Sequence, residues 1–104
     1  MSTLGPLTVV ARLKIRSGSE AAAEALFRRH IDHVRREEPG TLTYVLHRSR
    51  KDASTFLFHE RYVDAAAFDR HGKSAAMQAL FRELTPLLDG PPAIDLYDEI
   101  DGKH

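Results

Sequence analysis

Apolar and polar residues alternate in four segments of the chain, and this period of two residues predicts four β-strands. The segments are residues 7–15, 41–48, 54–62 and 93–100. A short polar turn, residues 49–53, joins the middle two strands as an antiparallel hairpin. Each strand has one apolar face that we expect to pack against helices: Leu7, Val9, Ala11, Leu13 and Ile15; then Leu42, Tyr44 and Leu46; then Phe56 and Phe58; then Ile94, Leu96 and Ile100.

Apolar residues recur every three or four positions after the first strand, which predicts a helix there. Ser17 and Glu20 have the spacing of a capping box, so we expect them to begin this helix. Pro39 and Gly40 end it, because proline disfavours a helical residue before it and glycine permits a sharp turn.

Two shorter helices are predicted between the third and fourth strands. Asp64 is a good N-cap for the first of them, and Gly72 is expected to end it. Ser74 is expected to cap the second, which carries an apolar stripe at helical spacing. The stripe consists of Met77, Leu80, Phe81 and Leu84.

This order of elements predicts an α+β protein with the ferredoxin-like βαββαβ arrangement, in which helices cover one face of a four-stranded antiparallel sheet. Residues 1–104 are long enough for one domain with a hydrophobic core. The other sheet face carries Val45 and Leu57, and apolar side chains left exposed there favour association. We therefore expect a homodimer that packs through this sheet face.

Composition narrows the possible functions. The 15 basic residues balance the 15 acidic ones without a long run of either sign, which argues against a nucleic-acid or membrane surface. The chain has no cysteine, so disulfides and thiolate chemistry are excluded. It has no nucleotide-binding glycine motif, no apolar run of membrane-spanning length and no pattern of a signal peptide at its start. We therefore expect a cytoplasmic protein without a nucleotide cofactor.

The sixteen-residue stretch HERYVDAAAFDRHGKS, residues 59–74, holds the main candidate site. Alternation along the third strand places Glu60 and Tyr62 on the face of the two phenylalanines, whereas His59 points the other way. His71 closes the following short helix and can reach over the same region. Glu60, Tyr62 and His71 are therefore predicted to converge between the sheet and the helices.

Structural roles for the same residues stay open at this stage. Glu60 could form an ion pair with Arg12 or Arg70, because a buried carboxylate without a partner is costly. Tyr62 could belong to the core, with its hydroxyl bonded. His71 could favour the carbonyl end of its helix.

Two further histidines suggest a metal site only weakly. His30 and His33 are three residues apart, which allows two ligands on one helix face. No third ligand has a matching spacing, so we expect no metal.

The stretch EEPGTLTYVLHRSRKDASTFLFHERYVDAAAFDRH, residues 37–71, resembles the antibiotic biosynthesis monooxygenase family of small ferredoxin-like proteins that form dimeric α+β barrels. The resemblance extends over nearly the whole chain. One departure is that Ala76 stands where the family pattern has a second histidine. The residues that fit the pattern are Pro39, Gly40, Tyr44, Glu60, Tyr62, His71 and Ser74.

The resemblance implies oxidation of a small electron-rich aromatic, a quinol or a polyketide-like phenol, by O₂ without metal or flavin. In such chemistry a base removes a phenolic proton and the resulting anion reduces O₂ directly. We expect His71 to accept the proton, Tyr62 to donate a hydrogen bond and position the substrate, and Glu60 to orient one of them. The expected substrate-binding residues are Tyr44, Phe58, Phe68, Met77 and Phe81.

Two other functions remain open on the same fold. The alanine at position 76 favours a non-catalytic dimer that binds a small molecule. An isomerase acting on a small metabolite is the other, because this fold does not by itself determine the reaction.

Overall fold

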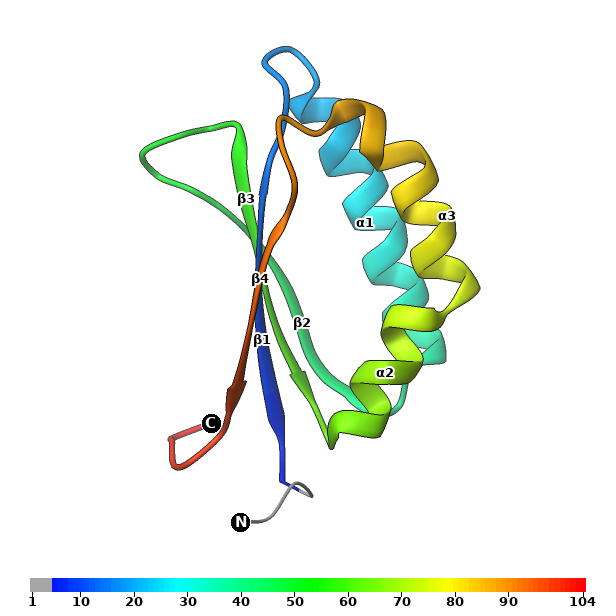
Figure 1. Cartoon of the computed structure of the whole chain (residues 1–104), viewed down its shortest axis with the longest axis vertical. Coiled ribbons are helices and arrows are strands. Elements are labelled where there is room, and N and C mark those ends of the chain that lie inside the picture. Colours follow the sequence, from blue (N-terminus) through cyan, green and yellow to red (C-terminus); the bar gives the residue numbers. More distant parts are fainter. Residues whose placement is uncertain (1–4) are drawn as a thin grey trace.

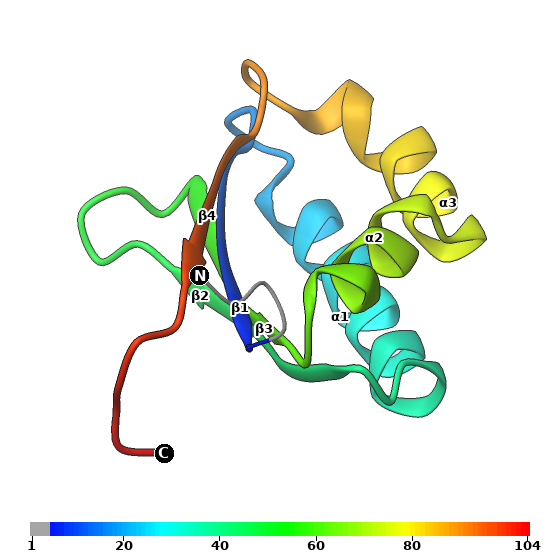
Figure 2. The ribbon, with the colours of Figure 1, turned by 60° about the horizontal axis from the view of Figure 1, so that its bottom comes forward.

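The structure, a computed structural model, describes residues 5–104. Four antiparallel strands form one sheet in the order β2-β3-β1-β4, and the helices cover one of its faces (Figures 1 and 2). This arrangement confirms the predicted α+β, ferredoxin-like fold. The elements in chain order are β1 (Leu7–Lys14), α1 (Glu20–Glu37), β2 (Thr41–Arg48), β3 (Thr55–Tyr62), α2 (Ala65–Lys73), α3 (Ala75–Leu84), the 3₁₀ helix η1 (Thr85–Leu87) and β4 (Ala93–Asp98).

The core lies between the sheet and the helices, as the alternation predicts. The central strands β1 and β3 pair so that Leu13 is opposite Phe56 and Ala11 is opposite Phe58. Phe27 of α1 packs on both phenylalanines, with ring centroids 5.4 and 5.2 Å apart, and it is fully buried. Burial of such aromatic rings contributes a large share of the stability of a small domain.

Two of the predicted helix caps are confirmed. The Asp64 side chain accepts a hydrogen bond from the Ala67 backbone N–H at 2.8 Å, and Ser74 accepts one from the Met77 N–H at 3.1 Å. The prediction that Gly72 ends α2 is wrong, because the helix continues through Lys73. Ser74 has extended backbone angles and so ends α2 and begins α3 at a single residue.

The predicted capping box at the start of α1 is also wrong. The N-cap position is Ser19, and it makes no side-chain cap. Glu20 instead accepts hydrogen bonds from the Gly18 backbone N–H at 2.8 Å and from the Ser54 hydroxyl at 2.5 Å. Its side chain therefore joins the start of α1 to the loop between β2 and β3.

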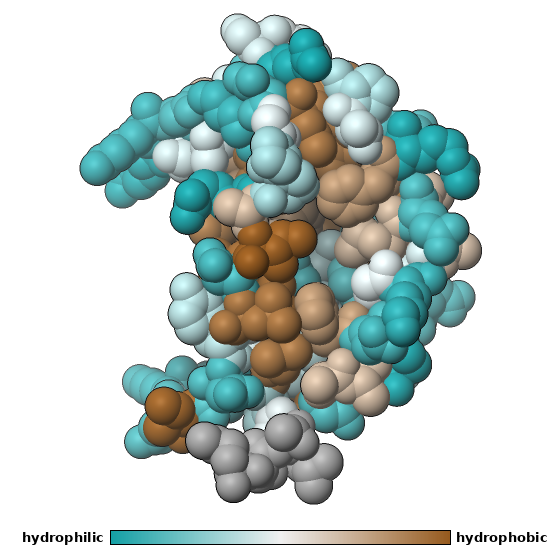
Figure 3. Space-filling view, viewed as in Figure 1, coloured by the Kyte–Doolittle hydropathy of each residue, from teal (hydrophilic) through white to brown (hydrophobic). Residues whose placement is uncertain are grey.

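Four predicted apolar positions are exposed. Leu42 lies where the pairing of β2 with β3 shifts register, so it leaves the helix-facing side and is 49% exposed. Ile100 lies beyond the end of β4. Ile94 and Leu96 keep the expected face but stay half exposed, because β4 is an edge strand that the helices do not cover. Figure 3 shows apolar surface at this edge, beside the helices.

The second sheet face is turned away from all the helices of the described chain (Figure 2). His59 lies on this face, opposite Val10 of β1 and Val45 of β2, as the alternation predicts. Leu57 shares the face and is partly exposed. Among residues 5–104, no helix combines the length and the apolar character that crossing a membrane requires.

Candidate active site

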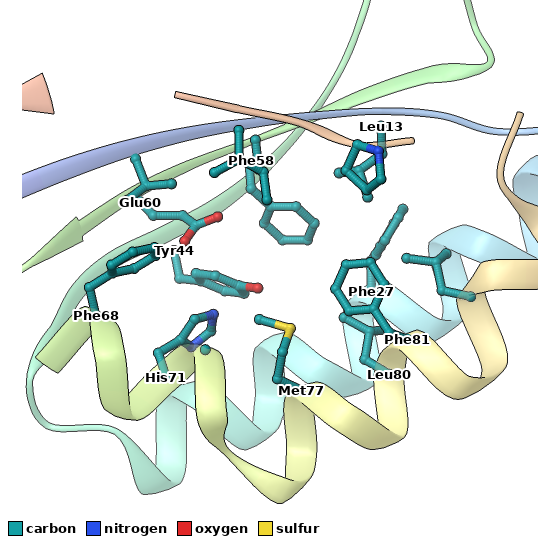
Figure 4. A pocket seen from close by; sticks show the side chains of 16 residues that line it. Leu13, Phe27, Tyr44, Phe58, Glu60, Phe68, His71, Met77, Leu80 and Phe81 are labelled. Atoms are coloured by element: carbon teal, nitrogen blue, oxygen red, sulfur yellow. The ribbon is translucent and has the colours of Figure 1, made fainter. Parts of the chain in front are cut away.

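A cavity of about 390 Å³ lies between the sheet and the helices. Figure 4 shows its lining, which is apolar except at one end. The edge strand β4 contributes Ile94, which is half exposed, to the lining. The lining residues are Val9, Ala11, Leu13, Phe27, Tyr44, Phe58, Glu60, Phe68, His71, Gly72, Met77, Leu80, Phe81, Leu84, Pro92 and Ile94.

Glu60 supplies a buried carboxyl group at the polar end. It sits on β3 opposite Val9 of β1 and Tyr44 of β2, with its side chain on the helix-facing side. The Tyr62 hydroxyl donates a hydrogen bond to Glu60 Oε1 at 2.5 Å. Tyr62 is itself fully buried and does not line the cavity, so it supports Glu60 from behind.

His71 completes the polar end from the helix layer. Its ring is 5.1 Å from the Tyr44 ring and 5.4 Å from the Tyr62 ring, and in Figure 4 it lies on the opposite side of Tyr44 from Glu60. Nδ1 lies 2.8 Å from Oε1 of Glu38. Nε2 is buried and has no hydrogen-bond partner in the part of the chain that the structure describes.

Burial controls the protonation of the groups around the cavity. It raises the pKa of Glu60 to about 7, although the Tyr62 hydrogen bond opposes the effect and the charge of Glu38 adds to it. It also raises the pKa of Tyr62 and of Tyr44 well above the ordinary 10.0, with the Glu60 charge contributing to both. Both tyrosines therefore keep their protons at neutral pH and can donate hydrogen bonds.

His30 is a further buried histidine beside this end. Its ring contacts those of Tyr44 and His71, with centroids 5.7 and 5.8 Å away. Burial, and then the proximity of His71, lowers the pKa of His30 to about 4. Its ring stacks on His33 at 6.4 Å, but no group of three or more potential ligands for a metal occurs within residues 5–104.

The structure brings the three predicted residues together. Tyr62 contacts both Glu60 and His71. The ion pair considered for Glu60 does not form: Arg12 is on the other sheet face, opposite Leu57, and Arg70 lines a separate cavity. The predicted substrate-binding residues Tyr44, Phe58, Phe68, Met77 and Phe81 all line the main cavity.

Sequence reasoning missed Glu38 as the partner of His71. Glu38 directly precedes the Pro39 and Gly40 pair that ends α1, and no pattern in the sequence marks it as a site residue. A clue was available in the hairpin, because Thr41 pairs with Tyr62 and so brings the end of α1 close to the end of β3, where α2 begins. Phe27 and His30 of α1 were not predicted at the site either, although both lie on the buried face of the helix.

Similarity to known proteins identifies the family of this chain. The sequence profile described as antibiotic biosynthesis monooxygenase matches residues 6–83. The chain belongs to the antibiotic biosynthesis monooxygenase family. No significant match was found among curated proteins.

Solved structures share the antibiotic biosynthesis monooxygenase fold over nearly the whole chain. A Caulobacter crescentus CB15 protein, described as a candidate antibiotic biosynthesis monooxygenase, is 29% identical with a TM-score of 0.91, over 95% of this chain and 93% of that one. SO0527 from Shewanella oneidensis is 30% identical with a TM-score of 0.84, over 92% of each chain. Rv0793 from Mycobacterium tuberculosis is 27% identical with a TM-score of 0.88, over 96% of this chain and 100% of that one. Family and neighbours together support a general monooxygenase-like function.

Proposed function

We propose that this protein is a cofactor-independent monooxygenase that oxidises a small electron-rich phenol or quinol with O₂. The observation that carries the proposal is the clustering of Glu60, Tyr44 and His71 at one end of an otherwise apolar cavity. At about 390 Å³ the cavity is in the size range of small-molecule sites. Apolar walls suit an aromatic ring, and the polar end suits its hydroxyl group.

The geometry favours a division of roles that differs partly from the sequence-based expectation. His71 remains the proton acceptor, through Nε2, which has no partner in residues 5–104. The hydrogen-bond donor is Tyr44, which lines the cavity and keeps its proton. Glu60 faces the substrate and Tyr62 orients Glu60, which reverses the roles expected for these two residues.

The reaction balances without a further co-reactant. His71 Nε2 takes the phenolic proton, and the phenolate gives one electron to O₂, so that a substrate radical and superoxide form. These combine through a new carbon–oxygen bond, and the peroxide anion takes the proton back from His71 Nε2. The hydroperoxide then breaks its O–O bond and loses water. The substrate thus loses two hydrogens, one from its hydroxyl group and one from the reacting carbon, and gains one oxygen as a carbonyl group, while the second oxygen leaves in the water. The apolar walls keep bulk water from the anion.

The proposal includes a homodimer. Val10, Val45 and Leu57 lie on the sheet face that no helix of the described chain covers, and Val45 is 44% exposed. A second copy of the same face would bury these side chains. Light scattering should give twice the chain mass of 11.7 kDa, and Leu57→Glu should give the monomer mass. A monomeric parent protein would contradict this part of the proposal.

The test is oxygen consumption by metal-free protein over a panel of quinols and phenols. His71→Ala should lower kcat by about 10²- to 10⁴-fold, the usual contribution of a general base. His104→Ala is the matched control, because this exposed histidine pairs with Glu99 and neither residue lines the cavity. Unchanged turnover in His71→Ala would refute the role of His71.

The same panel separates the two alternatives. Binding of an aromatic ligand without oxygen consumption or product would indicate the non-catalytic dimer. Product formed without uptake of oxygen would indicate an isomerase.

A further inference from the structure

Glu38 occupies a constrained position at the end of α1. Its backbone N–H donates to the Val34 carbonyl, and its own carbonyl accepts from the Thr41 N–H, both at 3.1 Å. Its side-chain Oε1 is 2.8 Å from His71 Nδ1 and accepts a hydrogen bond from the Thr41 hydroxyl, also at 2.8 Å. Backbone and side chain together therefore hold the carboxyl group in one place.

Helix energetics do not explain an acid at this position. The carboxyl end of a helix carries a partial negative charge, which favours basic residues, as Arg35 and Arg36 in the last turn of α1 illustrate. The Glu38 side chain is also only 15% exposed, and its Oε2 is buried without a hydrogen-bond partner in the described residues. A residue that opposes local preferences in this way points to a role at a site.

His71 separates two cavities of different character. The main cavity is the apolar one, and a second cavity of about 260 Å³ lies behind the ring. His71 lines both, whereas Glu38 lines only the second, together with Arg70. Polar and charged residues make up most of the lining of the second cavity, in contrast to the first. In Figure 4 the other side of the ring is directed towards Tyr44.

We propose that Glu38 is a positioning residue, which holds the His71 ring with its proton on Nδ1 and its basic nitrogen, Nε2, towards the substrate cavity. A carboxylate can only accept hydrogen bonds, so the nitrogen 2.8 Å from it must donate. Nε2 then carries the lone pair. When His71 takes a proton, the Glu38 carboxylate compensates the new positive charge. The catalytic part of this inference rests on the proposed function, but the state of the ring does not.

The first test measures the ring itself. Long-range ¹H–¹⁵N correlation spectra of the ¹⁵N-labelled full chain distinguish the two neutral histidine tautomers. The wild type should show His71 with Nδ1 protonated. Glu38→Gln should keep that form, because its amide oxygen still accepts a hydrogen bond, and Glu38→Ala should lose it. Glu37→Gln is the control, since this exposed neighbour lines the same second cavity but contributes no hydrogen bond to His71.

The second test measures turnover. Glu38→Ala should lower kcat by about 10- to 100-fold with little change in KM, the usual effect of losing the group that orients a functional histidine. Glu38→Gln should fall between Glu38→Ala and the wild type, because it restores the geometry without the charge, and Glu37→Gln should match the wild type.

The inference is overturned if wild-type His71 carries its neutral-form proton on Nε2, or if folded Glu38→Ala keeps it on Nδ1. Circular dichroism and thermal unfolding establish that each variant is folded. The spectra need no substrate, so the expected tautomers in a protein that oxidises nothing would support the positioning role and refute the proposed function separately.

Discussion

The two ends of the cavity are built on the same strands but have opposite energetic roles. At the apolar end, Phe27 and Leu84 line the cavity and are fully buried in the main core. At the polar end, Glu60 and His71 are almost as deeply buried, at 5% and 3% exposure, but they bring ionisable groups out of water. Burial therefore stabilises the first end and opposes ionisation at the second.

Strand β3 passes from one end to the other without a break. Phe56 and Phe58 belong to the main core, and Glu60 and Tyr62 continue the same face two and four residues later. One face of a single continuous strand therefore carries aromatic side chains at one end of the cavity and a carboxyl group at the other. The rigid apolar end therefore fixes the position of groups that would not stay buried without such a support.

The largest expected loss of stability comes from a substitution at the apolar end. Phe27→Ala removes a fully buried ring that packs on Phe56 and Phe58, and it should lower the free energy of unfolding by about 3–5 kcal/mol. Urea unfolding followed by circular dichroism measures this. Phe68→Ala is the comparison at the polar end, where the ring is only partly buried against Tyr62, so its loss should be clearly smaller. Equal losses would show that the two ends do not differ in this way.

The second effect comes from Glu60 and depends on pH. Burial raises its pKa from 4.5 to about 7, so between these values the folded state holds a proton that the unfolded state has released. The contribution of Glu60 to the free energy of unfolding should therefore fall by about 3 kcal/mol as pH rises through this range. Glu60→Gln cannot ionise. It should match the wild type near pH 4.5 and be more stable than the wild type at pH 8, as urea unfolding at several pH values would measure.

His30 changes the free energy of unfolding with pH in the opposite direction to Glu60. Its pKa falls from 6.5 to about 4 on burial, so its contribution to stability is lost as pH falls through this range. The two slopes oppose each other between pH 4.5 and 6.5, and Glu60→Gln should expose the rise with pH that His30 causes. Glu83→Gln, an exposed partner of Arg29, should keep the wild-type profile. A Glu60→Gln profile parallel to that of the wild type would contradict the assignment.

The periodicity of the sequence predicted most of the fold. The predicted and observed strand bounds differ by two residues at most. A strand with one buried face has only one register that keeps its apolar residues in the core. The predictions were wrong where a tertiary contact or a register shift overrode a local sequence pattern. Leu42 fits the alternation, but the register shift beside it turns the side chain out. Glu20 fits a capping box, but its carboxylate is bonded to Ser54 across the fold.

The candidate site was predictable only in part. Glu60 and Tyr62 follow from alternation along one strand, and His71 from its place at the end of a nearby helix. Glu38 is 33 positions from His71, and nothing local in the sequence joins the two. The sequence also does not show which of the two side chains faces the cavity, because Glu60 and Tyr62 share one face of β3. Only the packing of α2 on β3 shows that Tyr62 lies behind Glu60, away from the cavity.

The smallest effect tests the junction between the two ends. Ser74 joins α2, which carries His71, to α3, which carries the apolar stripe; its hydroxyl donates to the His71 carbonyl at 2.8 Å and accepts from the Met77 N–H. Ser74→Ala should lower the free energy of unfolding by about 1 kcal/mol, and Ser74→Thr should restore most of it, because threonine is also an N-cap residue. Ser17→Ala should change it by less than about 0.5 kcal/mol, since Ser17 is exposed and does not cap α1. If Ser74→Ala is as mild as Ser17→Ala, the hydroxyl does not hold the two helices together, and the two ends of the cavity are joined by core packing alone.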